Sequence, residues 1–97
     1  MFRHVVLFRF NPEVTPEQRR AIVDELRTLP GIIPELRDYR VGLDAGVNDG
    51  NHEMAVTADF DDVDGYLVYR DHPEHQRIIV ELIRPAIAER AAVQYAL

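Results

Sequence analysis

The segment of residues 2–10 places the strongest limit on how this chain can fold. Its side chains alternate between two sets, and a period of two residues predicts a β-strand. One set combines a histidine with apolar residues: His4, Val6, Phe8 and Phe10. The other set combines apolar residues with arginines: Arg3, Val5, Leu7 and Arg9. Because both faces are partly apolar, the strand needs a covering layer on each side.

The length of 97 residues predicts one domain, residues 1–97, and the hydrophobic content of 46% is ordinary for a globular chain. A chain this short buries only about 60 to 70% of the surface that its unfolded form exposes. An additional interface would therefore add stability, which favours a dimer. The absence of cysteine excludes disulfides and thiolate chemistry, and the absence of lysine excludes a Schiff base through a lysine amine.

The net charge of −6 argues against a nucleic-acid partner, because neutralising phosphates requires a clustered basic face. All eleven cationic side chains are arginines, and they are scattered along the chain. The sequence contains no leader segment and no apolar run approaching about 18 residues. We therefore expect a cytoplasmic protein with no membrane partner.

The first helix is predicted from a capping pattern. In the run from Thr15 to Gln18, the threonine hydroxyl caps a free amide, proline sets the first turn, and Gln18 completes the capping box. The helix continues with Ile22, Leu26 and Leu29 on one stripe. We expect it to stop at residues 30–31, which are Pro-Gly.

A second helical region follows the acidic run of residues 61–64, whose carboxylates suit the positive end of a helix dipole. This helix extends to Tyr69, and the next one starts at Pro73. Pro85 either kinks or splits that last helix.

Three further segments alternate as strands do: residues 36–43, 52–60 and 91–97, with a loop at residues 44–51. The order strand, helix, strand, strand, interrupted helix, strand is the split β-α-β arrangement. It predicts an α+β, ferredoxin-like fold with a four-stranded antiparallel sheet and helices on one face. The other face, which carries Val5 and Leu7, would be bare, and the simplest cover is a second copy in a dimeric α/β barrel.

Histidines mark the candidate site. His4 lies on the strand face that we assign to the helices, and an imidazole among apolar residues suggests a lined pocket. Two more occur in the run His72-Pro73-Glu74-His75, shortly after Tyr69. We expect His72 to cap the helix that starts at Pro73. His52, at the entrance of a strand, is expected to be solvated.

Four segments of the chain resemble the stress-responsive A/B barrel domain family, abbreviated Dabb. They are residues 2–10, residues 12–18, residues 29–34, and the element Tyr66-x-x-Tyr69-x-x-His72-Pro73-x-His75. The resemblance spans essentially the whole chain and implies a homodimeric α+β barrel. Most members of that family have no assigned activity.

The family includes a plant olivetolic acid cyclase, to which this chain bears a distant similarity and which closes a linear polyketide without a cofactor. It uses a first-strand histidine, a tyrosine and the second histidine of the helix element. Carried over by motif, the resemblance implies His4, Tyr69 and His75 as catalytic residues. A further histidine of that enzyme matches Met54 here, with His52 two residues earlier, so the correspondence is partial.

If Tyr69 and His75 come from the covering helices, their tips and that of His4 converge on an apolar cavity, as in small-molecule sites. His4 and His75 are then the acid and base candidates, and Tyr69 donates to a developing oxyanion. This predicts a protein that binds a small apolar or aromatic molecule, as a cofactor-free cyclase or isomerase would. Two alternatives remain: a noncatalytic dimeric stress or structural protein, and a cofactor-independent monooxygenase acting on an electron-rich phenol.

Metal binding is a further alternative. Pro73 separates His72 from His75, so these two do not form a two-histidine clamp on one helix. A site made of His4, His75 and a carboxylate such as Glu74 or Glu53 stays open, but we expect no metal and no cofactor.

Overall fold

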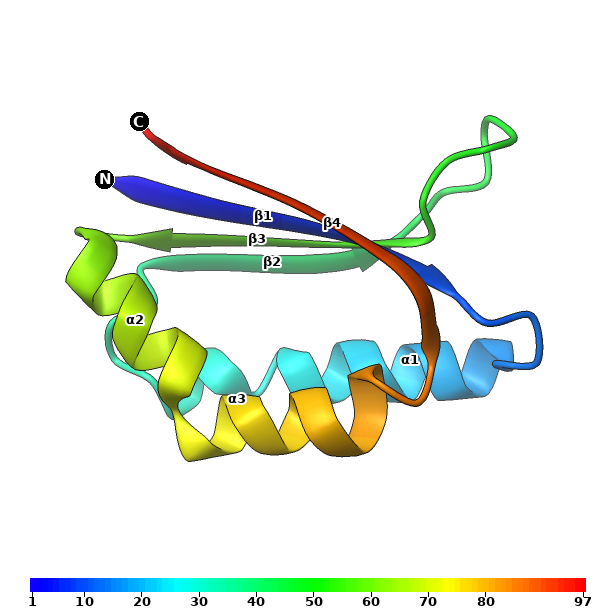
Figure 1. Ribbon diagram of the computed structural model, residues 1–97, viewed down its shortest axis with the longest axis horizontal. Coiled ribbons are helices and arrows are strands. Elements are labelled where there is room, and N and C mark those ends of the chain that lie inside the picture. Colours follow the sequence, from blue (N-terminus) through cyan, green and yellow to red (C-terminus); the bar gives the residue numbers. More distant parts are fainter.

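A single antiparallel sheet forms one layer of the molecule, and all helices lie on the same side of it (Figure 1). The strands of this computed structural model, which describes residues 1–97, are β1 (Phe2–Phe10), β2 (Asp38–Leu43), β3 (Met54–Phe60) and β4 (Ile87–Ala96). Their order is β2-β3-β1-β4, so β1 is paired on both edges. The predicted ferredoxin-like α+β fold is confirmed.

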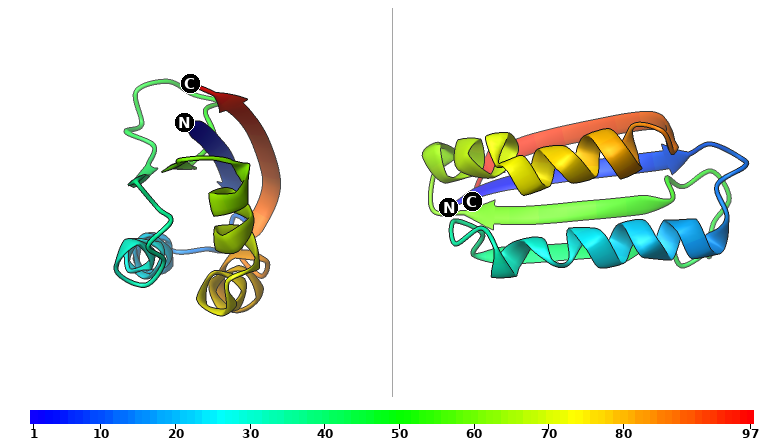
Figure 2. Two further views of the ribbon diagram at one scale, coloured as in Figure 1. Left: turned by 90° about the vertical axis from the view of Figure 1, so that its left-hand side faces the viewer. Right: turned by 90° about the horizontal axis from the view of Figure 1, so that it is seen from below.

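The helical layer has two parts. The first is α1 (Pro16–Leu26), followed by a short 3-10 turn at Leu29–Gly31; the second is α2 (Val63–Asp71) and α3 (Pro73–Ile78). The last helix continues as one wider π-helical turn over Ile79–Ile83. Seen from the helical side, α1 runs along the β2 side of the sheet, and α2 and α3 run along the β1 side (Figure 2). No helix is long and apolar enough to span a membrane.

The predicted caps are present. The Gln18 amide N–H donates to the Thr15 hydroxyl at 3.2 Å, and the Thr15 amide donates to the Gln18 side chain at 2.8 Å. Asp62 caps α2 by accepting from the Gly65 amide at 3.0 Å. The first helix ends at Leu26 and not at Leu29, because Leu29 starts the separate 3-10 turn with Pro30 in its first positions.

Two strands start later than predicted. The second begins at Asp38 and not at residue 36, because Leu36 lies in a turn in which its amide donates to the Ile33 carbonyl at 3.2 Å. The third begins at Met54 and not at residue 52. Just before it, the Glu53 carboxylate accepts from the Phe10 amide at 2.9 Å.

The last strand starts earlier than predicted, at Ile87 and not at residue 91, because it pairs with β1 from Phe10 onward. Its first residues carry no alternation, since β4 is an edge strand with both faces exposed. Pro85 neither kinks nor splits a helix: the π turn ends at Ile83, and Pro85 lies in the following turn.

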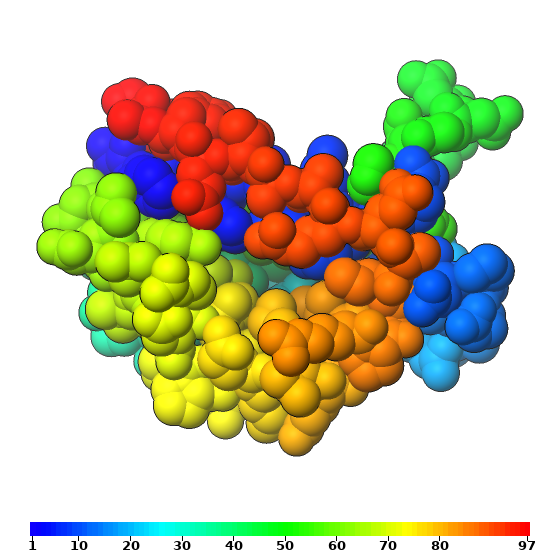
Figure 3. Space-filling view, in the orientation of Figure 1, coloured from blue at the N-terminus to red at the C-terminus, as the bar shows by residue number.

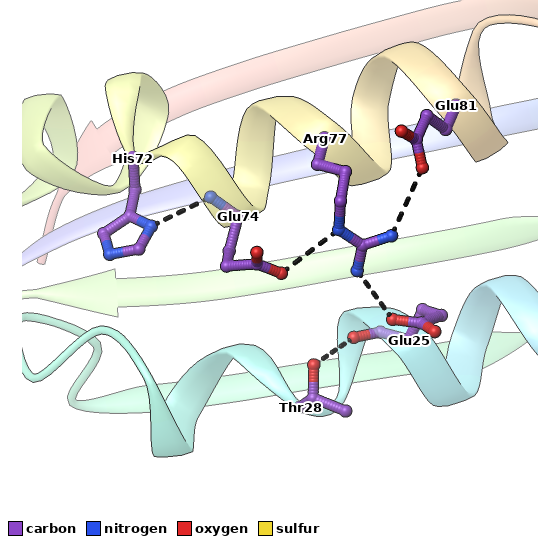
Figure 4. Close-up of polar contacts among 6 residues, drawn as sticks. All are labelled: Glu25, Thr28, His72, Glu74, Arg77 and Glu81. Atoms are coloured by element: carbon purple, nitrogen blue, oxygen red, sulfur yellow. Dashed lines mark hydrogen bonds and ion pairs between the residues drawn. The ribbon is translucent and has the colours of Figure 1, made fainter.

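Arg77 connects the two parts of the helical layer (Figure 4). From α3 it contacts Glu25 of α1 at 3.1 Å, and it also contacts Glu74 at 3.2 Å and Glu81 at 3.4 Å. Such partly exposed pairs add little stability individually. The contact between Arg77 and Glu25 holds α3 beside α1 and so links the two parts of the helical layer.

The core lies between the sheet and the helices, and the other sheet face has no cover within the chain. Val6, Phe8 and Phe10 of β1 are buried, as the alternation predicted. On the open face, Leu7 is 37% exposed and Val93 is 58% exposed. The predicted split between a covered and a bare face is therefore confirmed.

Adjacent isoleucines provide a matched test of this core. Ile33 is 0% exposed, whereas Ile32 is 42% exposed. We expect Ile33→Ala to lower the free energy of unfolding by about 2–5 kcal/mol, because it leaves a cavity in the core. Ile32→Ala should change it by less than about 1 kcal/mol. Urea denaturation followed by circular dichroism measures both, and equal losses would contradict this assignment of the core.

Candidate functional site

A cavity of about 240 Å³ lies between the sheet and the helices α2 and α3. It opens beside β4, where the space-filling view shows a hollow between the red-orange end strand and the yellow helices (Figure 3). A cavity of about 150 Å³ can hold benzene, so this one has room for a single ring with short substituents. The residues around it come from β1, β3, β4 and the helices: His4, Val6, Phe8, Leu26, Val56, Tyr66, Tyr69, Arg70, His75, Gln76, Ile79, Ile83, Arg84 and Arg90.

His4 projects from β1 into this cavity and is only 5% exposed. Burial lowers its pKa to about 4, and the positive charge of Arg90 acts in the same direction. The ring is therefore neutral at pH 7. Its Nδ1 accepts a hydrogen bond of 2.9 Å from the Gln94 side-chain amide, so the ring proton lies on Nε2.

His75 lies in the first turns of α3 and has the opposite tautomer. Its Nδ1 is 3.0 Å from the Arg70 carbonyl, which can only accept, so Nδ1 carries the proton and donates. Burial lowers the pKa of this histidine as well. Neutral His75 therefore keeps an unprotonated Nε2.

Both histidines line one cavity, and their Nε2 atoms differ: that of His4 carries the ring proton and that of His75 does not. Neither Nε2 has a hydrogen-bond partner within the chain. No fully enclosed polar side-chain atom lacks a partner, so both free Nε2 atoms are accessible. A ligand would meet an N–H donor at His4 and a lone pair at His75.

Tyr69 lines the same cavity from α2, and its ring stacks on that of His75 at 4.1 Å between centroids. Its hydroxyl lies 3.1 Å from the Tyr39 hydroxyl of β2. Burial raises the pKa of Tyr39 to about 12 and that of Tyr69 well above its usual value, so both hydroxyls stay protonated. When Tyr39 donates to Tyr69, the Tyr69 proton is free for a ligand.

The structure brings together His4, Tyr69 and His75, as the sequence predicted, and it adds residues that the sequence analysis did not select. Tyr66 lines the cavity as well: its ring lies 4.9 Å from that of His4, and its hydroxyl has no partner in the chain. Gln94 and Arg90 lie on β4. Only the correct register of β4 against β1 would have placed them near His4.

The two remaining histidines have other roles. His72 caps α3 as predicted, since its Nδ1 accepts from the Glu74 amide at 3.1 Å (Figure 4). His52 precedes β3 and lies 3.8 Å from a Glu89 oxygen, with 28% of its side chain exposed. It is therefore less solvated than predicted and lies outside the cavity.

The carboxylates considered for a metal site are engaged elsewhere. Glu53 is bound by Arg19 at 2.6 Å, and Glu74 contacts Arg77. Neither lines the cavity. The chain contains no cluster of three or more histidine, aspartate or glutamate side chains that could hold a metal ion.

The family model of the stress responsive A/B barrel domain, Dabb, matches residues 2–97. The chain belongs to this family. A search of curated proteins gave no match to this Dabb domain.

Solved structures with the same fold include proteins from three organisms. A dimeric ferredoxin-like protein of unknown function from Thermobifida fusca has 46% identity and a TM-score of 0.91, covering 99% of this Dabb domain and 90% of that chain. A dimeric protein of unknown function from Bacteroides fragilis has 28% identity and a TM-score of 0.83, covering 99% and 95%. A hydroxynitrile lyase from Passiflora edulis has 22% identity and a TM-score of 0.85, covering 99% and 92%; this likeness is one of fold.

The pKa of His4 predicts an acid-sensitive fold. Its folded value is about 4 and its ordinary value is 6.5, so between these pH values the unfolded chain binds more protons. Stability should therefore fall as the pH drops from 6.5 towards 4, by roughly 3 kcal/mol from this group. His4→Gln should remove that part of the loss. Urea unfolding of both proteins at pH 7 and pH 4 tests this, and identical acid losses would refute it.

Proposed function

We propose that this Dabb domain binds a small apolar or aromatic molecule in its cavity and catalyses a cofactor-free proton transfer on it, as a cyclase or isomerase would. The observation that carries the proposal is the pair of opposite tautomers. His75 offers a lone pair and His4 offers an N–H to the same space. A base and a hydrogen-bond donor are the minimum for forming and stabilising an enolate.

In the proposed step, Nε2 of His75 takes a proton from a carbon next to a carbonyl group. The C–H electron pair becomes the enolate double bond, and the carbonyl electrons move to oxygen. The Nε2–H of His4 donates to that oxygen, and Tyr69 is a second donor when Tyr39 donates to it. Where a C=C bond adjoins that carbon, the enolate extends over it, and returning the proton from His75 to its far carbon completes an isomerisation. Where the molecule carries a second carbonyl, attack of the enolate carbon on it closes a ring, and the alkoxide formed takes the proton from His75. Neither outcome needs an oxidant.

Burial prepares both histidines for these roles at neutral pH. Lowered pKa values keep His75 unprotonated, as a base must be, and keep His4 neutral. Aliphatic side chains such as Val6 and Ile79 line the same cavity and suit an apolar ring.

Proton abstraction can be measured before the natural substrate is known. With phenylacetone as a single-ring probe in D₂O, we expect the protein to accelerate deuterium incorporation next to the carbonyl. His75→Ala should reduce this acceleration by about 10²- to 10⁴-fold, the usual contribution of a general base. Proton NMR follows the exchange, and circular dichroism confirms that the variant is folded.

His52→Ala is the matched control, since it removes a histidine outside the cavity and should leave the exchange rate unchanged. Binding of the probe is measured separately by ligand-observed NMR. If the probe binds but His75→Ala exchanges it as fast as the unmodified protein does, the cavity is a binding site without this chemistry. The noncatalytic alternative would then be favoured.

We also propose that the domain forms a homodimer through its open sheet face. The dimeric relatives from Thermobifida fusca and Bacteroides fragilis support this assembly. The face combines exposed Leu7 and Val93 with charges that already have partners within the chain. Arg3, for example, binds Asp59 through two contacts of 2.7 and 2.8 Å. Covering the face would therefore not bury this arginine without a charged partner.

Light scattering after size exclusion tests the dimer. The protein should run at twice its chain mass of 11.2 kDa. Leu7→Asp should run at the mass of one chain, because it adds an unpaired charge to the apolar face. Val80→Asp changes a side chain of the helical layer that is 50% exposed and should remain dimeric. A dimeric Leu7→Asp protein would exclude this interface.

A further inference from the structure

The cavity differs in charge from the rest of the protein. Three arginines line it and no aspartate or glutamate does, although the chain has a net charge of −6. Arg70 is engaged by Asp71 through contacts of 2.8 and 3.1 Å. Arg84 and Arg90 have no ion pair and no side-chain hydrogen bond within the chain. Two guanidinium groups thus lack an anion at this site.

The π turn accounts for the position of Arg84. Its amide donates to the Ile79 carbonyl at 2.9 Å, a bond to the fifth preceding residue. In a regular α-helix, residue 84 would be rotated about 140° away from residue 79. The wider turn brings the two residues onto one face, and both line the cavity. Such turns are frequent at functional sites.

Arg90 reaches the cavity from the opposite side. It lies on β4 in register with Phe8 of β1, on the sheet face that the helices cover elsewhere. The residues of β4 after Ile87 are exposed on this face as well. Arg84 and Arg90 therefore belong to two different elements and line one cavity, which His4 and His75 also line.

We infer that the ligand of this cavity is a small organic anion, a single ring bearing a carboxylate, whose carboxylate is bound by Arg84 and Arg90. The inference rests on the proposed function, because it names the ligand class of the same cavity. A planar guanidinium matches a carboxylate with two parallel hydrogen bonds, and such charge-assisted bonds are stronger than neutral ones. The volume of about 240 Å³ limits the rest of the molecule to about one ring with short substituents.

Benzoate and its uncharged analogue benzamide form the test pair, with affinities measured by isothermal titration calorimetry at low ionic strength. We expect benzoate to bind at least about tenfold more tightly than benzamide, because it gains charge-assisted bonds. Arg84→Gln and Arg90→Gln should each remove most of that preference. Arg20→Gln is the matched control, since Arg20 is a surface residue of α1 with 63% of its side chain exposed.

The outcomes separate the inference from the proposed function. Equal affinity for benzoate and benzamide, or a preference that survives both cavity substitutions, overturns the anion inference and leaves the cavity as a ring-binding site. No binding of either compound overturns both. Inorganic phosphate binding as tightly as benzoate would show a cationic surface without a ring site, and this also overturns the inference.

Discussion

The packing of one face of β1 against the helices positions everything else in this domain. β1 is hydrogen-bonded along both edges, so its register sets the places of β3 and β4. Its inward side chains provide the floor of the core and, at His4, the floor of the cavity. The residues of β4, at one edge of the sheet, are almost all exposed. The cavity lies where this edge strand meets the helices α2 and α3.

The sequence predicted those parts of the fold that depend on local patterns. The alternation in residues 2–10, the capping box at Thr15 and the cap at His72 each depend on residues close together in the chain. The first residues of β4 were missed because an edge strand with two exposed faces has no apolar alternation to reveal it. For the same reason, the positions of Gln94 and Arg90 near the cavity were not predicted. The residues opposite them lie on β1, more than 80 residues earlier.

The π turn was equally inaccessible from sequence. Nothing in the run from Ile79 to Ile83 distinguishes it from an α-helix, since its apolar residues suit either geometry. The wider turn depends on how this helix meets the sheet and the following turn. The convergence of His4 and His75 was predictable as a shared face, but the hydrogen-bonding role of each ring was not, because a main-chain carbonyl and a distant amide decide it.

His4 and His75 are chemically identical side chains, and they differ in tautomer because their Nδ1 atoms have different hydrogen-bond partners. For His4, that partner is a single side-chain amide on the edge strand β4, near the C-terminus. A glutamate at position 94 would accept a hydrogen bond from Nδ1–H where glutamine now donates to Nδ1, and so would turn Nε2 of the neutral ring from a donor into an acceptor. Both histidines would then have an unprotonated Nε2, and the cavity would lose the imidazole N–H of His4 without any change in the histidines or the fold. One side chain on an edge strand therefore decides which hydrogen-bonding group His4 presents.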